Sequence, residues 1–236
     1  VNHWCDCINR CSPYFTAKIL IERNCLLNTH KPKNFIPALK YHAFTRFYDT
    51  VVHFTTRETV FKTALVKQSV SHPGERLLDL GCGTGTLTMM MAENAPELQV
   101  VGVDVDPATL EKAQKKLSSY SDRVSLQQGL AQQLPFKSDS FEIVVSSLFF
   151  HHLTTEQKLE TLKEAFRVLK PGGRLHIADW GKPSSFVQRV LFIVVQLLDG
   201  FETTQDSVEN TLPKLIKDSG FTHIANKQFF PTPLGT

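Results

Sequence analysis

Residues 79–86 read Asp-Leu-Gly-Cys-Gly-Thr-Gly-Thr and stand between an apolar run at 76–80 and an amphipathic stretch at 86–93. A strand that leads into a glycine-rich turn and then a helix is typical of nucleotide-type binding in α/β proteins. Glycine lets the chain turn sharply and lets a ligand approach the backbone without a clash against Cβ. The spacing G-x-G-x-G differs from the G-x-G-x-x-G of dinucleotide enzymes, and no Lys-Ser/Thr follows, which excludes a P-loop. The stretch therefore predicts a Rossmann-like site for another kind of ligand.

Short apolar runs alternate with amphipathic stretches on the C-terminal side of the Pro73-Gly74 turn signal. The predicted strands are 76–80, 99–104, 124–128, 142–147 and 174–178. Four helical stretches are predicted as crossovers: 86–93, 107–118, a short polar one near residue 131, and 155–169. Asp106-Pro107 is a good helix start, and Lys170-Pro-Gly-Gly is a good helix stop. This alternation predicts an α/β fold: a doubly wound, mostly parallel sheet with helices on both faces.

The chain divides by composition into two parts. Residues 1–34 are predicted to be a loosely ordered N-terminal extension. Residues 35–236 are predicted to form the folded domain, and 35–70 its helical lid. Residues 1–40 carry six Lys or Arg against two acidic residues, which leaves 20 basic and 21 acidic residues in the rest. The main part therefore has no excess of basic charge, which argues against nucleic acid as a partner.

Four of the five cysteines lie in the extension, at positions 5, 7, 11 and 25. Their C-x-C-x3-C-x13-C spacing is not a usual zinc pattern, so we expect no metal site. The remaining cysteine, Cys82, has no obvious disulfide partner, which favours a reducing compartment and a cytoplasmic protein.

A second acidic position supports the nucleotide-type reading. The second predicted strand ends in Val101-Gly-Val-Asp104, 19 residues after Gly85. An acid at the end of this strand can accept hydrogen bonds from the two hydroxyls of a ribose. The alternative is that Asp79 and Asp104 only cap turns.

Together these motifs resemble those of the class I, Rossmann-like S-adenosylmethionine-dependent methyltransferases. The branch they resemble is that of ubiquinone and menaquinone biosynthesis (methyltransferase type 11/25). The stretches that carry the resemblance are 79–86, 101–106, 139–142, 151–153 and 169–175. The resemblance implies S-adenosyl-L-methionine as cofactor and a sheet of the seven-stranded type. Residues 226–230 resemble the sixth strand, and the seventh would be truncated or very short.

The resemblance also implies cofactor contacts at matching positions. Glycines 81, 83 and 85 would border the methionine end, Asp104 would hold the ribose, and Val105 would pack on the adenine. The segment that usually reads Gly-Asp-Ala reads Gly129-Leu-Ala131 here, so Leu130 replaces an acid that accepts from the adenine amino group. Losing that contact costs about 1 kcal/mol. The expected cofactor residues are Asp79, Gly81, Cys82, Gly83, Gly85, Asp104, Val105, Leu130, Ala131 and Ser146.

Ligands of open α/β sheets lie beyond the carboxyl ends of the strands, so residues after the fourth and fifth strands are expected to face the methyl acceptor. His151 is the candidate general base, because histidine titrates near neutrality. The alternative is that one of the two adjacent histidines caps the next helix and the other packs against it. The expected residues on the acceptor side are Tyr48, Phe150, His152, Asp179 and Trp180.

Residues 186–201 are the longest apolar stretch, and four polar residues interrupt it, so it falls short of a bilayer span. Its apolar positions surround the helix almost fully, which indicates core packing, a homodimer contact or a lid over an apolar acceptor. We therefore expect an enzyme that methylates a small or medium, largely apolar molecule, without stable membrane insertion. The alternative is a cofactor-binding scaffold or regulatory protein that does not catalyse.

Overall fold

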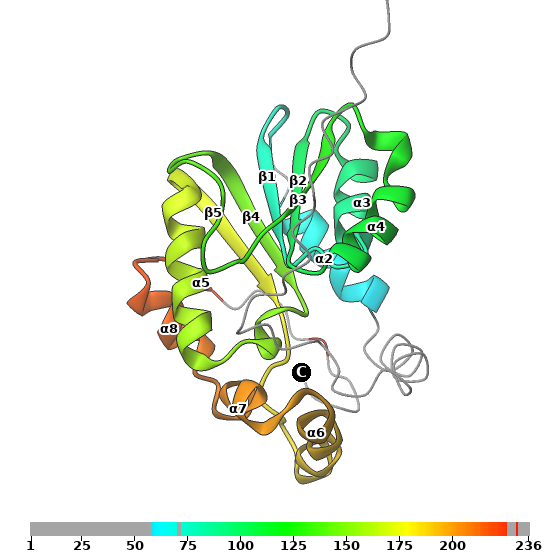
Figure 1. Ribbon diagram of the computed structural model, residues 1–236. Coiled ribbons are helices and arrows are strands. Elements are labelled where there is room, and N and C mark those ends of the chain that lie inside the picture. Colours follow the sequence, from blue (N-terminus) through cyan, green and yellow to red (C-terminus); the bar gives the residue numbers. More distant parts are fainter. Residues whose placement is uncertain (1–57, 70–71, 226–229, 231–236) are drawn as a thin grey trace, which may run out of the picture. The chain divides into compact units, whose positions relative to one another are not determined.

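The computed structural model describes residues 58–69, 72–225 and 230. In this part of the chain, five parallel strands form one sheet in the order β3-β2-β1-β4-β5 (Figure 1). They are β1 (Arg76–Leu80), β2 (Gln99–Asp104), β3 (Val124–Gln128), β4 (Phe141–Ser147) and β5 (Leu169–Ala178). The predicted α/β fold with a parallel sheet is confirmed. The predicted sixth strand falls almost wholly outside the described residues, as do the N-terminal extension and residues 35–57 of the lid.

Helices cover both faces of the sheet. The helices of the described residues are α2 (Glu58–Ser69), α3 (Thr86–Asn94), α4 (Pro107–Lys116), α5 (Thr155–Val168), α6 (Phe186–Asp199), α7 (Phe201–Glu209) and α8 (Leu212–Asp218), with 3₁₀ turns η1 (Ser118–Tyr120) and η2 (Phe150–His152). Apolar side chains of α2 and α3 pack on one face of the sheet. Those of α5 pack on the other face. This two-sided covering explains why the central strands read as continuous apolar runs.

Local sequence signals set most of the helix ends. Asp106 accepts a hydrogen bond from the amide of Ala108 and begins α4, as predicted. Thr154 and Gln157 form a reciprocal capping box at the start of α5. The hypothesis that a histidine caps this helix is therefore wrong, because the threonine already fills that position.

The structure differs most from the prediction in β5 and in the crossover near residue 131, and the other predicted strand and helix bounds within the described residues differ by two residues at most. β5 begins at Leu169, five residues earlier than expected, because Phe141 pairs with Leu169 across a register shift in the ladder. The crossover near residue 131 contains no helix. α5 holds this segment with side chains instead: Arg167 donates to the carbonyls of Leu134 and Phe136, and Glu164 accepts from the amide of Leu134.

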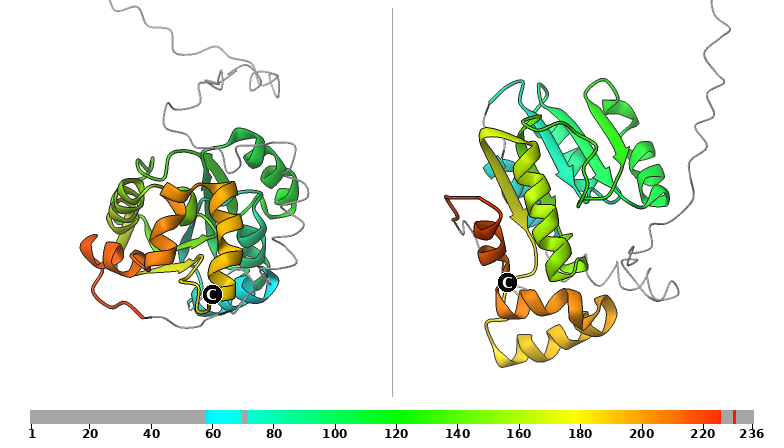
Figure 2. Two further views of the ribbon diagram at one scale, coloured as in Figure 1. Left: turned by 90° about the horizontal axis from the view of Figure 1, so that it is seen from below. Right: turned by 60° about the vertical axis from the view of Figure 1, so that its left-hand side comes forward.

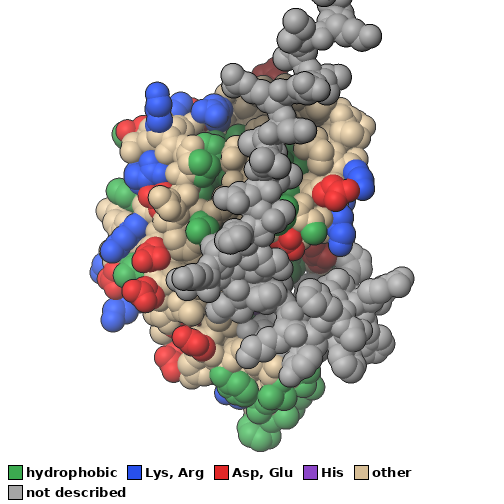
Figure 3. Space-filling view, in the orientation of Figure 1, with side chains coloured by type: hydrophobic (Ala, Val, Ile, Leu, Met, Phe, Trp, Pro, Cys, Tyr) green, Lys and Arg blue, Asp and Glu red, His purple; other side chains and the backbone are tan. Residues whose placement is uncertain are grey.

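The helices α6 and α7 lie as a pair beyond the carboxyl end of β5 (Figures 1 and 2). α6 buries Phe192 and Val195, which pack against Trp180 after β5. Its outward face exposes apolar side chains, with Phe186 83% exposed, and hydrophobic groups gather there in Figure 3. The inner face is therefore core packing, and a homodimer contact on the outer face stays a prediction. No helix among the described residues is long and apolar enough to cross a membrane.

Candidate functional site

The glycine loop after β1 adopts backbone conformations that favour glycine. Gly81, Gly83 and Gly85 have φ angles of 71°, 54° and 74°. A Cβ at position 81 would lie 2.4 Å from the ring of Phe149, and one at position 85 would lie 2.9 Å from Leu117. The loop therefore needs glycine both for its turn and for close approach of its neighbours. The sequence prediction placed this loop correctly between β1 and α3.

Asp104 links the end of β2 to the glycine loop. Its Oδ2 atom accepts from the amide of Gly83 at 2.8 Å, and its Oδ1 atom accepts from the amide of Asp106 at 3.0 Å. Burial raises the pKa of Asp104, and these backbone amides oppose the rise. Each carboxylate oxygen has a second lone pair, so the side chain can still accept from two hydroxyls. The accepting oxygens of Asp104 therefore fit the two hydroxyls of a ribose at this position.

Asp79 lies inside β1, just before the loop. Its side chain is almost fully buried, and Oδ2 accepts from the hydroxyl of Thr88 at 2.6 Å. Burial raises the pKa of this carboxyl to about 6, and the nearby Asp104 adds to the rise. Burial also raises the pKa of the neighbouring Cys82 thiol. Cys82 is therefore a neutral packing group, whereas Asp79 can change charge near neutrality.

The residues expected near an adenine lie after β2 and β3. Val105 and Leu130 are partly exposed, and Ala131 is buried in the core on the α5 face. Leu130 pairs with Gln133 in a short bridge. Ser146 is fully buried, and its hydroxyl donates to the carbonyl oxygen of Leu80. Its hydroxyl therefore joins β4 to β1.

Asp179 organises the turn that follows β4. Its Oδ2 atom accepts from three consecutive backbone amides, those of Phe149, Phe150 and His151, at 2.6–3.3 Å. Its Oδ1 atom accepts from the amide of Trp180 at 2.7 Å. One carboxylate after β5 thus fixes the backbone that leaves β4. The sequence named Asp179 as a residue on the acceptor side but did not reveal this bridging role.

Asp179 also pairs with His151. The Nδ1 atom of His151 lies 2.6 Å from Oδ1 of Asp179, and the two side chains are 5% and 4% exposed. Burial alone would raise the pKa of Asp179, but the charge and hydrogen bond of His151 lower it below its ordinary value. The His152 ring lies 3.9 Å from the His151 ring. Burial first, and His151 second, lower the pKa of His152 to about 3. Only His151 therefore has a partner that orients its ring.

The two phenylalanines of this turn face different surroundings. Phe150, predicted to face the acceptor, is 1% exposed and packs with Leu153 and Leu162 in the core. Phe149 is partly exposed, and its ring lies against Gly81. Phe149 is thus the aromatic group of this turn that lies against the glycine loop. No signal within the turn separates the two in the sequence, because Asp179, which binds their amides, is distant in the chain.

Trp180 is 8% exposed, and its ring lies 6.3 Å from that of His151 and 6.1 Å from that of Phe192. It therefore connects the turn after β4 to α6. Tyr48 and the four N-terminal cysteines lie outside the described residues. Among the residues that are described, no three His, Cys, Asp or Glu side chains are grouped as a metal site.

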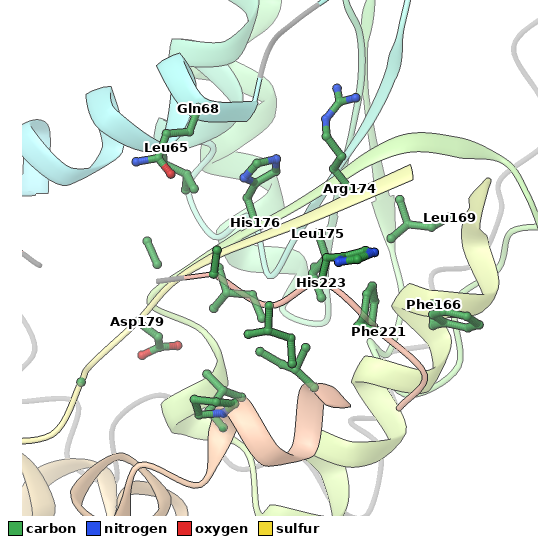
Figure 4. A pocket seen from close by; sticks show the side chains of 18 of the residues that line it. Leu65, Gln68, Phe166, Leu169, Arg174, Leu175, His176, Asp179, Phe221 and His223 are labelled. Atoms are coloured by element: carbon green, nitrogen blue, oxygen red, sulfur yellow. The ribbon is translucent and has the colours of Figure 1, made fainter. Parts of the chain in front are cut away.

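A hollow of about 1620 Å³ borders the outer side of β5. Figure 4 shows Leu65 and Gln68 of α2 on one side of it and Phe166 and Phe221 on another. It meets the turn after β4 only at Leu148 and reaches past β5 to Asp179 and Trp180. Since no glycine-loop residue lines it, this hollow belongs to the flank of the sheet and not to the cofactor end.

Residues 77–173, which contain the glycine loop, Asp104 and the turn after β4, match the family model described as a methyltransferase domain. An uncharacterized methyltransferase of Synechocystis sp. is 32% identical over 150 residues, which are 64% of this chain and 68% of that protein. The chain belongs to the methyltransferase domain family. The predicted family is thereby confirmed, and the cofactor of this family is S-adenosyl-L-methionine.

Other relatives of this methyltransferase domain carry more specific names. The demethylmenaquinone methyltransferase of Symbiobacterium thermophilum is 38% identical over 132 residues, which are 55% of this chain and 52% of that protein. The chain spans about half the length of most of the curated relatives it matches. Among solved structures, a phosphoethanolamine N-methyltransferase of Haemonchus contortus in complex with S-adenosyl-L-methionine has a TM-score of 0.56. It is 25% identical, with 68% of this chain and 36% of that one covered.

Proposed function

We propose that the protein transfers the methyl group of S-adenosyl-L-methionine to a small or medium, largely apolar acceptor of the quinone type. The observation that carries the proposal is the meeting of two built elements at neighbouring strand ends. One is the glycine loop closed by Asp104, and the other is the turn with His151 that Asp179 holds. β1 and β4 are adjacent and parallel, so their carboxyl ends lie side by side, where open sheets bind ligands.

On the cofactor side, the backbone of the glycine loop would border the amino-acid end, and Asp104 would accept from the ribose hydroxyls. The positive φ angles keep side chains away from this surface, and both oxygens of Asp104 retain accepting capacity. The bound cofactor supplies a methyl group that its sulfonium already activates. The protein's own part is then alignment of the acceptor and exclusion of water.

On the acceptor side, His151 would take the proton that a quinol hydroxyl loses as its ring is methylated. Asp179 holds Nδ1 of this imidazole, as the carboxylate of a catalytic triad holds the histidine that serves as its base. His152 is unsuited to this role, because a group with a pKa of about 3 is a weak base at neutral pH. Phe149, against the glycine loop, would supply an apolar wall for the ring.

The quinone-type acceptor draws on two further observations. The names of relatives from several bacteria specify demethylmenaquinone or ubiquinone and menaquinone biosynthesis. The side chains beyond β4 and β5 include Phe149 against the glycine loop and Trp180 next to His151, and no Lys or Arg stands in these turns before Lys182. Such a surface suits an uncharged ring better than a polyanion.

The test is methyl transfer from S-adenosyl-L-methionine labelled with deuterium in the methyl group. Demethylmenaquinol in detergent micelles is the apolar acceptor, and phosphoethanolamine is the polar comparison. We expect a labelled product only from the quinol, detected by mass spectrometry. His151→Gln should lower kcat on the order of 100-fold, whereas the neighbouring His152→Gln should change it much less.

Two other results would point elsewhere. Transfer to phosphoethanolamine alone would overturn the apolar acceptor. Tight binding of S-adenosylhomocysteine without transfer to a broad set of acceptors would instead support the scaffold or regulatory alternative.

A further inference from the structure

A buried ion pair joins α5 to α7. Lys158 is 2% exposed, and its Nζ atom lies 2.8 Å from Oδ2 of Asp206 and 2.7 Å from the carbonyl oxygen of Thr203. The hydroxyls of Thr155 and Thr211 donate to the two oxygens of Asp206 at 2.8 and 2.7 Å. Burial would raise the pKa of Asp206, but Lys158 and these hydroxyls lower it. Both charges are therefore hydrogen-bonded in the interior, Lys158 to two partners and Asp206 to three.

Such a pair is an inefficient way to gain stability. Removing two charges from water costs nearly as much as their attraction returns, so apolar residues of similar size often stabilise a fold equally well. A buried pair does, however, specify one arrangement of the elements it joins, because any other arrangement leaves a charge buried and alone. The pair between Lys158 and Asp206 thus permits one docking position for α7.

That docking position matters to the acceptor end of the sheet. Thr155 and Lys158 lie in the first turn of α5, directly after η2, which carries His151 and His152. α7 packs against η2 and against α6 (Figure 2). Only Gly200 separates α6 from α7, so the two helices form one hairpin of residues 186–209, here called the α6–α7 hairpin.

A second contact of the hairpin is a small apolar cluster. Phe192 and Val195 of α6 pack on Trp180, with the rings of Trp180 and Phe192 6.1 Å apart. Apolar contacts are not directional, so this cluster specifies the position of the hairpin less strictly than the ion pair does. Trp180 in turn lies edge to face with His151. A shift of the hairpin would therefore move Trp180, which lies beside the proposed base His151.

We propose that Lys158 and Asp206 are a positioning pair that fixes the α6–α7 hairpin against η2. The pair thereby sets the size of the acceptor space beside His151 and Trp180. This inference rests on the acceptor site of the proposed function. It assigns the pair to acceptor binding and not to cofactor binding, because neither residue contacts the glycine loop or Asp104 in the described structure.

The decisive variant is the double substitution Lys158→Met with Asp206→Leu, which replaces the pair by apolar groups of similar size. Trp180 fluorescence, measured in a Trp4→Phe background because the chain has two tryptophans, reports the seating of α6. We expect thermal unfolding and S-adenosylhomocysteine affinity close to the parent. Acrylamide quenching of Trp180 should rise at least twofold, and the KM for demethylmenaquinol should rise at least fivefold.

Two controls separate positioning from general stability. The exposed pair Glu111 and Lys115, replaced by Leu and Met, should change neither quenching nor KM. Lys158→Arg keeps the charge and should recover much of the parent KM. If the apolar double variant does not fold, Asp206→Glu is the second test, because it keeps both charges but adds one methylene group to the acidic side chain. It should raise Trp180 quenching and the acceptor KM while leaving S-adenosylhomocysteine affinity unchanged.

Unchanged quenching and unchanged KM in a folded pair variant would overturn the proposal. An equal loss of cofactor and acceptor affinity would also overturn it. If the parent protein methylates no acceptor while Trp180 quenching still rises in the double variant, the proposed function fails but the positioning of the hairpin stands.

Discussion

The glycine loop and the turn after β4 lie at adjacent strand ends, but different groups hold them in place. Mainly backbone groups hold the glycine loop: the amides of Gly81 and Cys82 both donate to the carbonyl of Val103, and the side chain of the adjacent Asp104 adds to them by accepting from the amide of Gly83. A single side chain holds the turn after β4, since Asp179 accepts from three of its amides. The first arrangement depends on where glycines stand in one short motif. The second depends on a carboxylate about 30 residues away in the sequence.

Because different groups hold the glycine loop and the turn after β4, substitutions should affect the two ends differently. A loop held mainly by backbone hydrogen bonds tolerates changes in neighbouring side chains, provided the glycines and Asp104 remain. A turn held by one distant carboxylate can be retuned by changes on β5, α6 or α7 without touching the cofactor end. The cofactor end should therefore respond to substitution mainly in affinity, and the acceptor end mainly in stability and turnover.

The largest expected effect is on the free energy of unfolding, and it distinguishes buried Phe150 from Phe149 in the same turn. Phe150→Ala should cost about 3–5 kcal/mol in the free energy of unfolding, because it removes a buried aromatic ring from the cluster with Leu153 and Leu162. Phe149→Ala should cost much less, since that ring is partly exposed, and should instead lower turnover. Urea unfolding and methyl-transfer rates measure the two effects. Equal destabilisation by both substitutions would mean that Phe149 is also part of the core.

The same turn should lose stability when its carboxylate is removed. Asp179→Ala leaves the amides of Phe149, Phe150 and His151 without their acceptor, at a cost of about 2–4 kcal/mol at pH 7. Asp179→Asn keeps one accepting oxygen and should cost less. Urea unfolding measures the loss, and calorimetry should find S-adenosylhomocysteine affinity within about twofold of the parent.

The sign of the pH dependence follows from the pKa of Asp179. Since His151 and the amides lower this pKa in the folded protein, its stabilising contribution is present above the ordinary value of 3.8. The contribution is lost as the pH falls below that value. A loss of cofactor affinity as large as the loss of stability would show that the two ends are not independent.

At the cofactor end, Asp104→Ala should weaken S-adenosylhomocysteine binding by about 1.5–3 kcal/mol, or roughly 10–150-fold. It removes a charged acceptor from two hydroxyls and frees the amide of Gly83. Asp106→Ala is the matched control, because that carboxylate caps α4 and should affect stability by about 1 kcal/mol with little change in affinity. Calorimetry compares the two. Unchanged affinity in Asp104→Ala would show that the end of β2 does not hold the cofactor.

The two ends also differ in how far the sequence predicted them. β1, β2 and β3 were predicted with the bounds found. β1 and β2 are buried parallel strands, which give continuous apolar runs, and the glycine loop marks where β1 ends. The glycine loop and Asp104 followed from spacing alone. These features are local, and local patterns are visible in a single sequence.

The acceptor end could be predicted only as a set of candidates. Nothing near residue 151 shows that Asp179 will reach back to it, since that contact depends on β4 and β5 being neighbours. The same limit explains Phe149 and Phe150, whose order in the turn is set by the three amides bound to Asp179. It also explains why the buried pair of Lys158 and Asp206 was missed, because each residue reads as an ordinary surface charge on its own helix.

The smallest expected effect concerns the pH dependence of cofactor binding. In the folded protein burial raises the pKa of Asp79 from 3.8 to about 6, so this carboxyl is mostly ionised at pH 7 and mostly protonated at pH 5. A ligand with positive charge favours the ionised form, so its binding should release a proton as Asp79 ionises. The affinity for S-adenosyl-L-methionine should therefore fall about tenfold from pH 7 to pH 5.

The matched variant is Asp79→Asn, which keeps an oxygen for Thr88 but cannot ionise. Its affinity for S-adenosyl-L-methionine should vary much less between pH 5 and pH 7. The variation that remains would come from Asp104, whose pKa burial also raises. Calorimetry in buffers of different ionisation enthalpy measures the released proton directly. A parent protein that releases no proton near pH 6, or an Asp79→Asn variant with the full tenfold change, would show that Asp79 does not sense the cofactor's charge. The carboxyl would then serve only to join β1 to α3 through Thr88, and the cofactor end would depend on its backbone and Asp104 alone.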